Sequence, residues 1–247
     1  MNRRHFLEAA ATGSAAVVLP DQLSAEQTPR RWTSGKQRVS LLELFTSEGC
    51  SSCPPAGRWF SGLRNDDRLW TEFVPLAFHV DYWDNLGWKD PFSDPAHTLR
   101  QRAYATLWQS DTIYTPGFVL NGREWRRSSS ARPALPPKTR APVLSVVQTA
   151  SHTFAIRFES ESESDKPATL IFNLALLGME EISEVTRGEN AGRTLLHDFM
   201  VLAHQRAVAN ESSTTLRVTH PKAKAVAAWV SAPNNPTPLQ STGGWLR

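Results

Sequence analysis

The sequence predicts an α/β domain followed by a mainly β, sandwich-like domain. Two kinds of hydrophobic pattern lead to this expectation. Between residues 38 and 127, apolar strand-like runs alternate with helical runs, as in α/β units. Between residues 143 and 247, short runs follow a period of two and turn-rich segments separate them, which is typical of a β-sandwich. Residues 128–142 are rich in proline and serine and are predicted to link the two domains.

The first domain is predicted to alternate strands and helices. Pro54 and Pro55 suit the first turn of a helix, where a missing N–H costs nothing. Asp94 is placed to cap a second helix, with Pro95 at its first position. The expected elements, in order, are a strand over 39–45, a helix from Pro54, a strand over 73–82, a helix over 94–108, and a strand over 118–120 that enters a turn at Asn121-Gly122.

The second domain is predicted to consist of short strands. Phe154, Ile156 and Phe158 would lie on one face of the first of them. Further candidates are 169–177, 194–203, 214–219 and 223–231. Residues 195–205 fit a helix equally well, and the pattern leaves both alternatives open.

The N-terminus is predicted to be an export signal. Arg3 and Arg4, followed by Phe6 and Leu7, resemble the twin-arginine signal of bacteria, and the leader is expected to span residues 1–25. Its apolar stretch is too short to cross a bilayer, so no stable membrane insertion is expected. Residues 26–37 then form a polar linker. The expected destination is the periplasm or the cell exterior.

The charge balance argues against nucleic-acid binding. The net charge is +3 at pH 7, and basic clusters such as Arg126-Arg127 are short. Solvated surface explains such clusters better than a phosphate-binding stripe does.

Cys50 and Cys53 form the motif on which the functional prediction depends. They are the chain's 2 cysteines, and they lie between a predicted buried strand and a predicted helix start. A thiol at a helix N-terminus faces unpaired N–H groups, which stabilise its thiolate. Cys50, expected to be the more exposed sulfur, is therefore the predicted nucleophile, and Cys53 is predicted to resolve the mixed disulfide.

Two other interpretations of the cysteine pair stay open. A structural disulfide is one, although a loop this short would constrain the unfolded chain weakly. A metal site is the other, although a four-ligand zinc site calls for a second Cys/His pair at similar spacing. No second C-x-x-C motif exists in the chain.

Several segments resemble a known family. They are residues 42–55, 77–84, 86–92, 100–104 and 114–116, and residues 187–193 also look familial. They resemble the thioredoxin superfamily and, more closely, an uncharacterised secreted bacterial family, domain of unknown function 1223. The resemblance implies a thioredoxin-like fold for residues 38–127. It also implies a cis Thr115–Pro116 bond beside the cysteines, with Thr115 and Pro116 contacting an extended substrate.

Two departures from thioredoxins concern the proton of Cys53 and the end of the domain. Leu44 stands where thioredoxins carry a buried acid, and Glu43, one residue away, is expected on the opposite face. The final thioredoxin helix would fall in the proline-rich 128–142 segment, so it is expected to be absent or shifted.

His79 and Asp81 lie two residues apart on one predicted strand face. They are candidates for the missing proton relay or for metal ligation, against the alternative of a packed, hydrogen-bonded histidine. The aromatic residues nearby are expected either to shape a peptide groove or to pack in the core; they are Tyr82, Trp83, Trp88 and Phe92. Glu48 is expected to be a solvated loop charge.

The sequence therefore predicts an exported thiol–disulfide oxidoreductase that acts on protein thiols or disulfides through its own redox-active disulfide, with no other cofactor and no metal. A Cu(I)-binding module using both thiolates is one alternative. A non-catalytic secreted interaction protein is the other.

Overall fold

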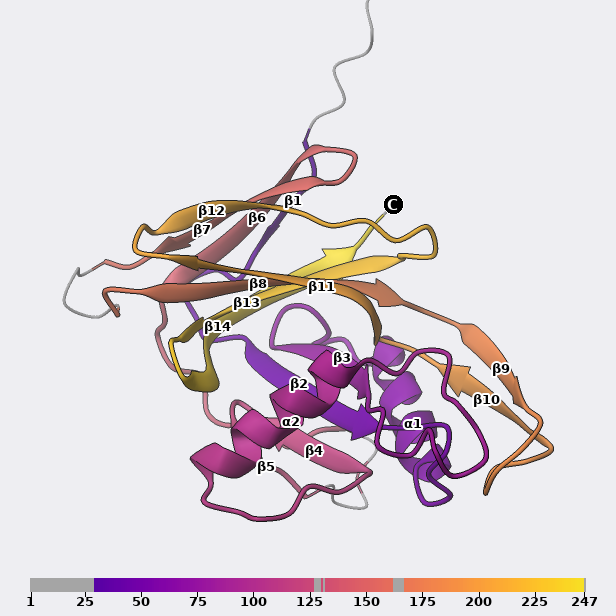
Figure 1. Cartoon of the computed structure of the whole chain (residues 1–247). Coiled ribbons are helices and arrows are strands. Elements are labelled where there is room, and N and C mark those ends of the chain that lie inside the picture. Colours follow the sequence, from indigo (N-terminus) through magenta and orange to yellow (C-terminus); the bar gives the residue numbers. More distant parts are fainter. Residues whose placement is uncertain (1–28, 127–129, 131, 162–166, 247) are drawn as a thin grey trace, which may run out of the picture.

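The computed structural model describes residues 29–126, 130, 132–161 and 167–246 (Figure 1). The predicted export signal over residues 1–25 lies outside the described residues, and so does part of the 128–142 segment.

A single large sheet joins the two halves of the chain. It has eight strands in the order β14-β13-β8-β11-β3-β2-β4-β5. In that order they are β14 (Asn235–Trp245), β13 (Ala225–Ala232), β8 (Leu170–Gly178), β11 (Met200–Ala209), β3 (Phe73–His79), β2 (Ser40–Thr46), β4 (Gly117–Leu120) and β5 (Arg123–Glu124). The β2–β3 and β3–β11 pairings are parallel and the others are antiparallel.

Two smaller sheets complete the strand structure. One has four strands, β1 (Arg31–Thr33), β6 (Val143–Ala150), β7 (Thr153–Glu159) and β12 (Ser213–Arg217). The other is a hairpin of β9 (Glu181–Val185) and β10 (Arg193–His197), which extends beside the first helix in Figure 1. The helical elements are α1 (Pro54–Gly62), the 3-10 turn η1 (Leu63–Asn65) and α2 (Pro95–Leu107).

The predicted fold class is wrong. The chain is mainly β, and no self-contained thioredoxin-like α/β domain precedes a separate β domain in the described residues. Met200 of β11 pairs with Ala77 of β3, so strands from the second half extend the sheet of the first half. The hydrophobic pattern marks individual strands, but it carries no information on which strands become neighbours.

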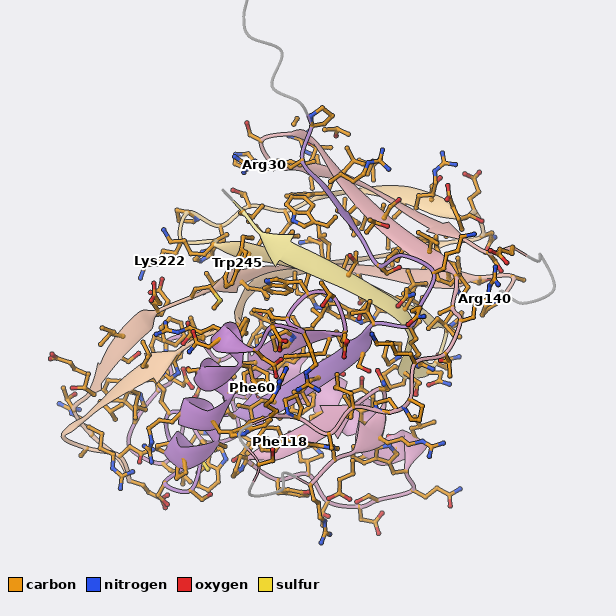
Figure 2. All side chains as sticks on the ribbon, turned by 180° about the vertical axis from the view of Figure 1, so that it is seen from behind. Arg30, Phe60, Phe118, Arg140, Lys222 and Trp245 are labelled. Carbon is orange, nitrogen blue, oxygen red and sulfur yellow. The ribbon has the colours of Figure 1, made fainter. Side chains whose placement is uncertain are left out.

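Three apolar cores hold the layers together. The first lies between α1 and one face of β2, β3 and β4, where Phe60 and Phe118 contact each other, with ring centroids 6.4 Å apart (Figure 2). The second lies on the other face of β2 and β3, against α2 and β13. The third fills the space between β8, β13 and the four-stranded sheet. The sheet curls so that Ser241 of β14 donates from its hydroxyl to the Val39 carbonyl at 2.8 Å.

Most individual elements near the cysteines were predicted correctly. The strands at β2, β3 and β4 form, and both helices begin with proline. The Asp94 carboxylate accepts from the Ala96 amide at 2.8 Å, which confirms the predicted cap. Residues 195–205, where helix and strand were both open, form the end of β10 and the start of β11.

The predicted linkers are structured where the chain is described. Within residues 26–37, β1 pairs with β6. The Arg38 amide donates to the Thr139 carbonyl at 2.8 Å, and the Ala141 amide donates to the Lys36 carbonyl at 3.1 Å, so the two segments run beside each other. No helix in the described part of the chain has the length and apolarity needed to span a membrane.

Candidate active site: two thiols beneath a hairpin

The cysteine loop joins β2 to α1. The Cys53 amide donates to the Cys50 carbonyl at 3.1 Å, which closes a turn, and Cys53 is the N-cap of α1. Pro54 follows as the first helical residue and lacks the N–H that would otherwise be unpaired. The predicted order of strand, cysteine loop and helix is confirmed.

Both cysteines are free thiols and both are buried. Cys50 is 0% exposed and Cys53 is 3% exposed, so both residues are closed to solvent and the expected exposure of Cys50 is not seen. The Cys50 sulfur lies 3.3 Å from the Ser52 hydroxyl and 3.7 Å from the Thr115 carbonyl oxygen. The fold therefore brings together residues 65 positions apart in the chain.

The two thiols differ strongly in acidity. A hydrogen bond from Cys53, helped by bonds from Ser52 and Thr115, lowers the pKa of Cys50 to about 6 against the opposing effect of burial. Burial, together with the neighbouring Cys50, raises the pKa of Cys53 far above its usual range. At neutral pH the pair therefore consists of a Cys50 thiolate and a Cys53 thiol, which is the arrangement a nucleophile and a resolving cysteine require.

Thr115 lies beside Cys50, with its carbonyl oxygen 3.7 Å from the sulfur. The Thr115–Pro116 bond is cis, as expected from the resemblance. The Trp83 indole donates to the Thr115 hydroxyl at 2.9 Å, and Gln101 donates to the Tyr114 carbonyl at 2.7 Å. These two contacts hold the segment against Cys50 just before β4 begins at Gly117.

The loop between β9 and β10 covers the cysteine motif. The fully buried Asn190 side chain donates to the carbonyls of Glu48 at 2.7 Å and Cys50 at 2.9 Å. The Ser51 amide donates to the Glu189 carboxylate at 3.1 Å. The hairpin therefore binds the backbone of the cysteine loop from about 140 positions further along the chain.

Glu48 is buried, so its expected role as a solvated loop charge is wrong. One carboxylate oxygen accepts from the Trp88 indole at 2.8 Å, and the other lies 2.8 Å from His197 Nε2. His197 is the last residue of β10, and its side chain is 12% exposed. Glu48 and His197, 149 positions apart in the sequence, thus form a pair of which the carboxylate is buried and the histidine is partly exposed.

His79 and Asp81, the candidates for a proton relay or for metal ligation, have different hydrogen-bond partners. His79, at the end of β3, places Nδ1 2.7 Å from the Asp90 carboxylate. The Asp81 carboxylate accepts instead from the Thr98 hydroxyl of α2 at 2.5 Å. Burial lowers the pKa of His79, but Asp90 outweighs it and the net shift is upward. His79 opposes the effect of burial on Asp90, and the pKa of that carboxyl is lowered.

A cavity of about 200 Å3 separates the cysteine motif from the histidines. Cys53 and Thr46 line it from the cysteine loop side, and His79 and His197 line it from the strand ends. Leu44 of β2 also lines this space. Among the described residues, no cluster of three metal-ligating side chains exists.

A family model described as a protein of unknown function, DUF1223, matches residues 41–232. The chain belongs to this family. No curated protein is significantly similar in sequence. A crystal structure of a protein from Agrobacterium tumefaciens is similar to the DUF1223 chain at 21% identity, with a TM-score of 0.56, over 85% of this chain and 94% of that one. HBP35 of Porphyromonas gingivalis is similar at 16% identity, with a TM-score of 0.51, over 86% and 76%.

These similarities concern the fold, because both identities are low. The site of the DUF1223 chain has to be interpreted from its own residues.

The sequence did not predict the contacts of Asn190, His197 and Glu48 at this site. The sequence feature that could have pointed to Asn190 was the 187–193 segment, which resembled the family but did not suggest a contact with the cysteines. The aromatic residues after β3 line the site by different contacts: Trp83 binds Thr115, Trp88 binds Glu48, and Phe92 packs against His79 and His197.

Proposed function

We propose that the chain is an exported thiol–disulfide oxidoreductase that acts on protein thiols or disulfides. The asymmetry of the two thiols carries this proposal. The pKa of Cys50 is lowered to about 6, whereas the pKa of Cys53 is raised. Thiolate character determines which sulfur attacks a disulfide, so Cys50 is the nucleophile and Cys53 the resolving thiol.

The proposed reaction consists of two exchanges. The Cys50 thiolate attacks one sulfur of a partner disulfide, a bond forms between Cys50 and that sulfur, and the other partner sulfur leaves as a thiolate. Cys53 then loses its proton and attacks Cys50, which forms the Cys50–Cys53 disulfide and releases the second partner thiolate. The partner gains two electrons and the protein loses two. The reverse sequence oxidises a partner dithiol.

A partner disulfide reaches Cys50 when the cover over the motif moves. Cys50 is 0% exposed. Asn190 of the 186–192 loop donates to its carbonyl, and Trp83 donates to the Thr115 hydroxyl beside it. The loop is held by hydrogen bonds rather than by an apolar core, and Asn190 supplies two of them. Such contacts open at modest free-energy cost.

The export part of the proposal rests on Arg3 and Arg4. A periplasmic or extracellular destination is an oxidising environment in which a Cys50–Cys53 disulfide persists. Fusion of residues 1–30 to a reporter that is active only after export tests this part. Lysine substitutions at Arg3 and Arg4 are expected to abolish reporter activity, and retained activity would contradict the twin-arginine assignment.

A trapping experiment tests the exchange itself. In Cys53→Ser the mixed disulfide at Cys50 cannot be resolved, so covalent adducts with partner proteins are expected to accumulate and to dissociate with reductant. Cys50→Ser is the matched control and should give no adducts. The proposal is wrong if Cys53→Ser forms none in the exporting cells and the wild-type protein neither reduces nor oxidises a model protein disulfide.

A further inference from the structure

The proposed function leaves the proton of Cys53 without an acceptor. Burial keeps this thiol protonated, and the position of the thioredoxin acid is occupied by Leu44. The other titratable side chains that line the cavity are Arg58, His79, His197 and Asp198. Arg58 has no acceptor atom, and one oxygen of Asp198 accepts from the Glu180 amide at 2.9 Å. We propose that His197, held by Glu48, accepts the proton of Cys53 across this cavity when Cys53 attacks the mixed disulfide. This inference rests on the proposed function.

The hydrogen bonds of Glu48 determine which nitrogen of His197 can take up a proton. Trp88 donates to one oxygen of Glu48, and His197 Nε2 contacts the other at 2.8 Å. Because a carboxylate accepts at both oxygens, His197 Nε2 is the donor and carries the hydrogen. Nδ1 is then the nitrogen that accepts a proton. Glu48 is a positioning residue that selects the tautomer and stabilises the imidazolium.

His79 is already committed to Asp90. The two Asp90 oxygens accept from the Phe92 amide at 2.9 Å and from the Glu48 amide at 2.8 Å, and the latter oxygen also lies 2.7 Å from His79 Nδ1. Both histidines line the cavity, but the His79 side chain is enclosed, whereas the His197 side chain is 12% exposed and can pass a proton on to solvent. His197 therefore serves as the base.

The surroundings of His197 support this division. Its ring lies edge-on to His79, with the centroids 4.9 Å apart, and Phe92 packs against both rings. The charged and titratable groups facing it from the neighbouring elements are Glu48, Cys53, Arg58, His79, Asp90 and Asp198. A space of about 200 Å3 has room for several water molecules, each of which occupies roughly 30 Å3 in the liquid, and such water is the proposed path of the proton.

The resolving step moves one proton and exchanges one S–S bond for another. The Cys53 S–H bond breaks and its proton moves to His197 Nδ1. The Cys53 thiolate attacks the Cys50 sulfur of the mixed disulfide, an S–S bond forms between the two cysteines, and the partner sulfur leaves with the electron pair of the broken bond. His197, whose side chain is 12% exposed, then returns the proton to solvent.

The test uses the reduced full chain and an aromatic disulfide whose released thiolate is coloured. Two phases of colour are expected, the first from attack by Cys50 and the second from resolution by Cys53. His197→Gln should leave the first phase unchanged and slow the second roughly 100-fold at pH 7, the lower end of general-base effects. In the variant the second rate should rise tenfold per pH unit, because hydroxide then removes the proton.

Two further variants complete the design. Glu48→Gln keeps a hydrogen-bond acceptor but removes the charge, so it should slow the second phase less than His197→Gln does. His204→Gln is the matched control, because His204 is another strand histidine, hydrogen-bonded at 3.1 Å to Asn173 and outside the cavity lining, and it should leave both phases unchanged.

The outcomes separate this inference from the proposed function. An unchanged second phase and pH profile in His197→Gln would overturn the role of His197 and leave the exchange reaction standing. A wild-type protein that shows one phase and forms no Cys50–Cys53 disulfide by mass spectrometry would overturn both. If His197→Gln does not fold, the same comparison of phases in Glu48→Gln decides.

Discussion

Two buried carboxylates from the same stretch of chain have very different partners. Glu43, in the middle of β2, accepts from Arg100 Nε at 2.6 Å and from the Tyr104 hydroxyl. Glu48, in the loop after β2, contacts His197 and Trp88. The first cluster is enclosed by aromatic rings, with the Arg100 guanidinium 4.9 Å from the Trp229 ring centroid. The second lies at the edge of a cavity that also contains a thiol.

The two carboxylates differ in the basic residue beside them: Glu43 has an arginine, and Glu48 has a histidine. Burial lowers the pKa of Arg100, but Glu43 and Tyr104 outweigh it and the net shift is upward, so this guanidinium does not titrate in any accessible range. The Glu43 cluster therefore ties α2 to the sheet, while the Glu48 cluster is the one to which we assign proton transfer. The same residue type at two positions five apart has different partners.

The largest expected effect comes from leaving Glu43 unpaired. Arg100→Met keeps the bulk of the side chain but removes the charge beside a fully buried carboxylate. We expect the free energy of unfolding in urea to fall by about 3–5 kcal/mol. The exposed Arg102→Met, on the same helix, is the control and should change it by less than about 0.5 kcal/mol. If both substitutions change the free energy of unfolding equally, the Glu43 cluster does not have the stabilising role that distinguishes it from the Glu48 cluster.

The acidity of Cys50 should depend on Cys53. The hydrogen bond from Cys53 is the largest cause of the lowered pKa of Cys50, so Cys53→Ala should raise that pKa from about 6 toward the ordinary value of about 8.5. Cys53→Ser retains a donor and should raise it less. The rate of alkylation of Cys50 against pH measures both values. A pKa that stays near 6 in Cys53→Ala would show that other donors hold the thiolate.

The hairpin loop should control access to Cys50. Asn190→Ala removes two hydrogen bonds to the cysteine loop, each worth about 0.5–1.5 kcal/mol. We expect Cys50 to be alkylated about tenfold faster, measured at a pH where the thiolate is fully formed in both proteins. Asn210→Ala, an exposed position, should have no effect. An unchanged rate in a folded Asn190→Ala protein would assign the cover to Trp83 instead.

The smallest expected effect is the pH dependence of the His79–Asp90 pair. The pKa of His79 is raised in the folded state, so its contribution to stability is fully present below about pH 6.5 and is lost as the pH rises through the folded value. A double-mutant cycle with His79→Gln and Asp90→Asn should give a coupling that falls by about 1 kcal/mol above that range. A cycle on Glu43 and Arg100 should give a constant coupling over the same range, and a parallel decline would contradict the comparison.

Local sequence determined the cysteine site itself. The apolar run over Val39–Phe45 predicts a buried strand, and Pro54 and Pro55 suit the first turn of a helix. The two cysteines lie between this strand and this helix in the sequence, so their position at the junction could be predicted. The family model that matches residues 41–232 agrees with the segments that carried the resemblance. In the same way, Asp94 and Pro95 were sufficient to place the start of α2.

Tertiary structure alone decided the fold class and the surroundings of the thiols. The parallel contact of Met200 with Ala77 merges the two halves into one sheet, and neither residue carries a signal for the other. Asn190 and His197 reach the cysteine loop because β9 and β10 fold back against α1. Glu48 has the sequence context of an exposed turn, and its burial depends on those distant strands. Periodicity reports which face of a segment is apolar, whereas partners more than a hundred residues away are selected by packing of the whole chain.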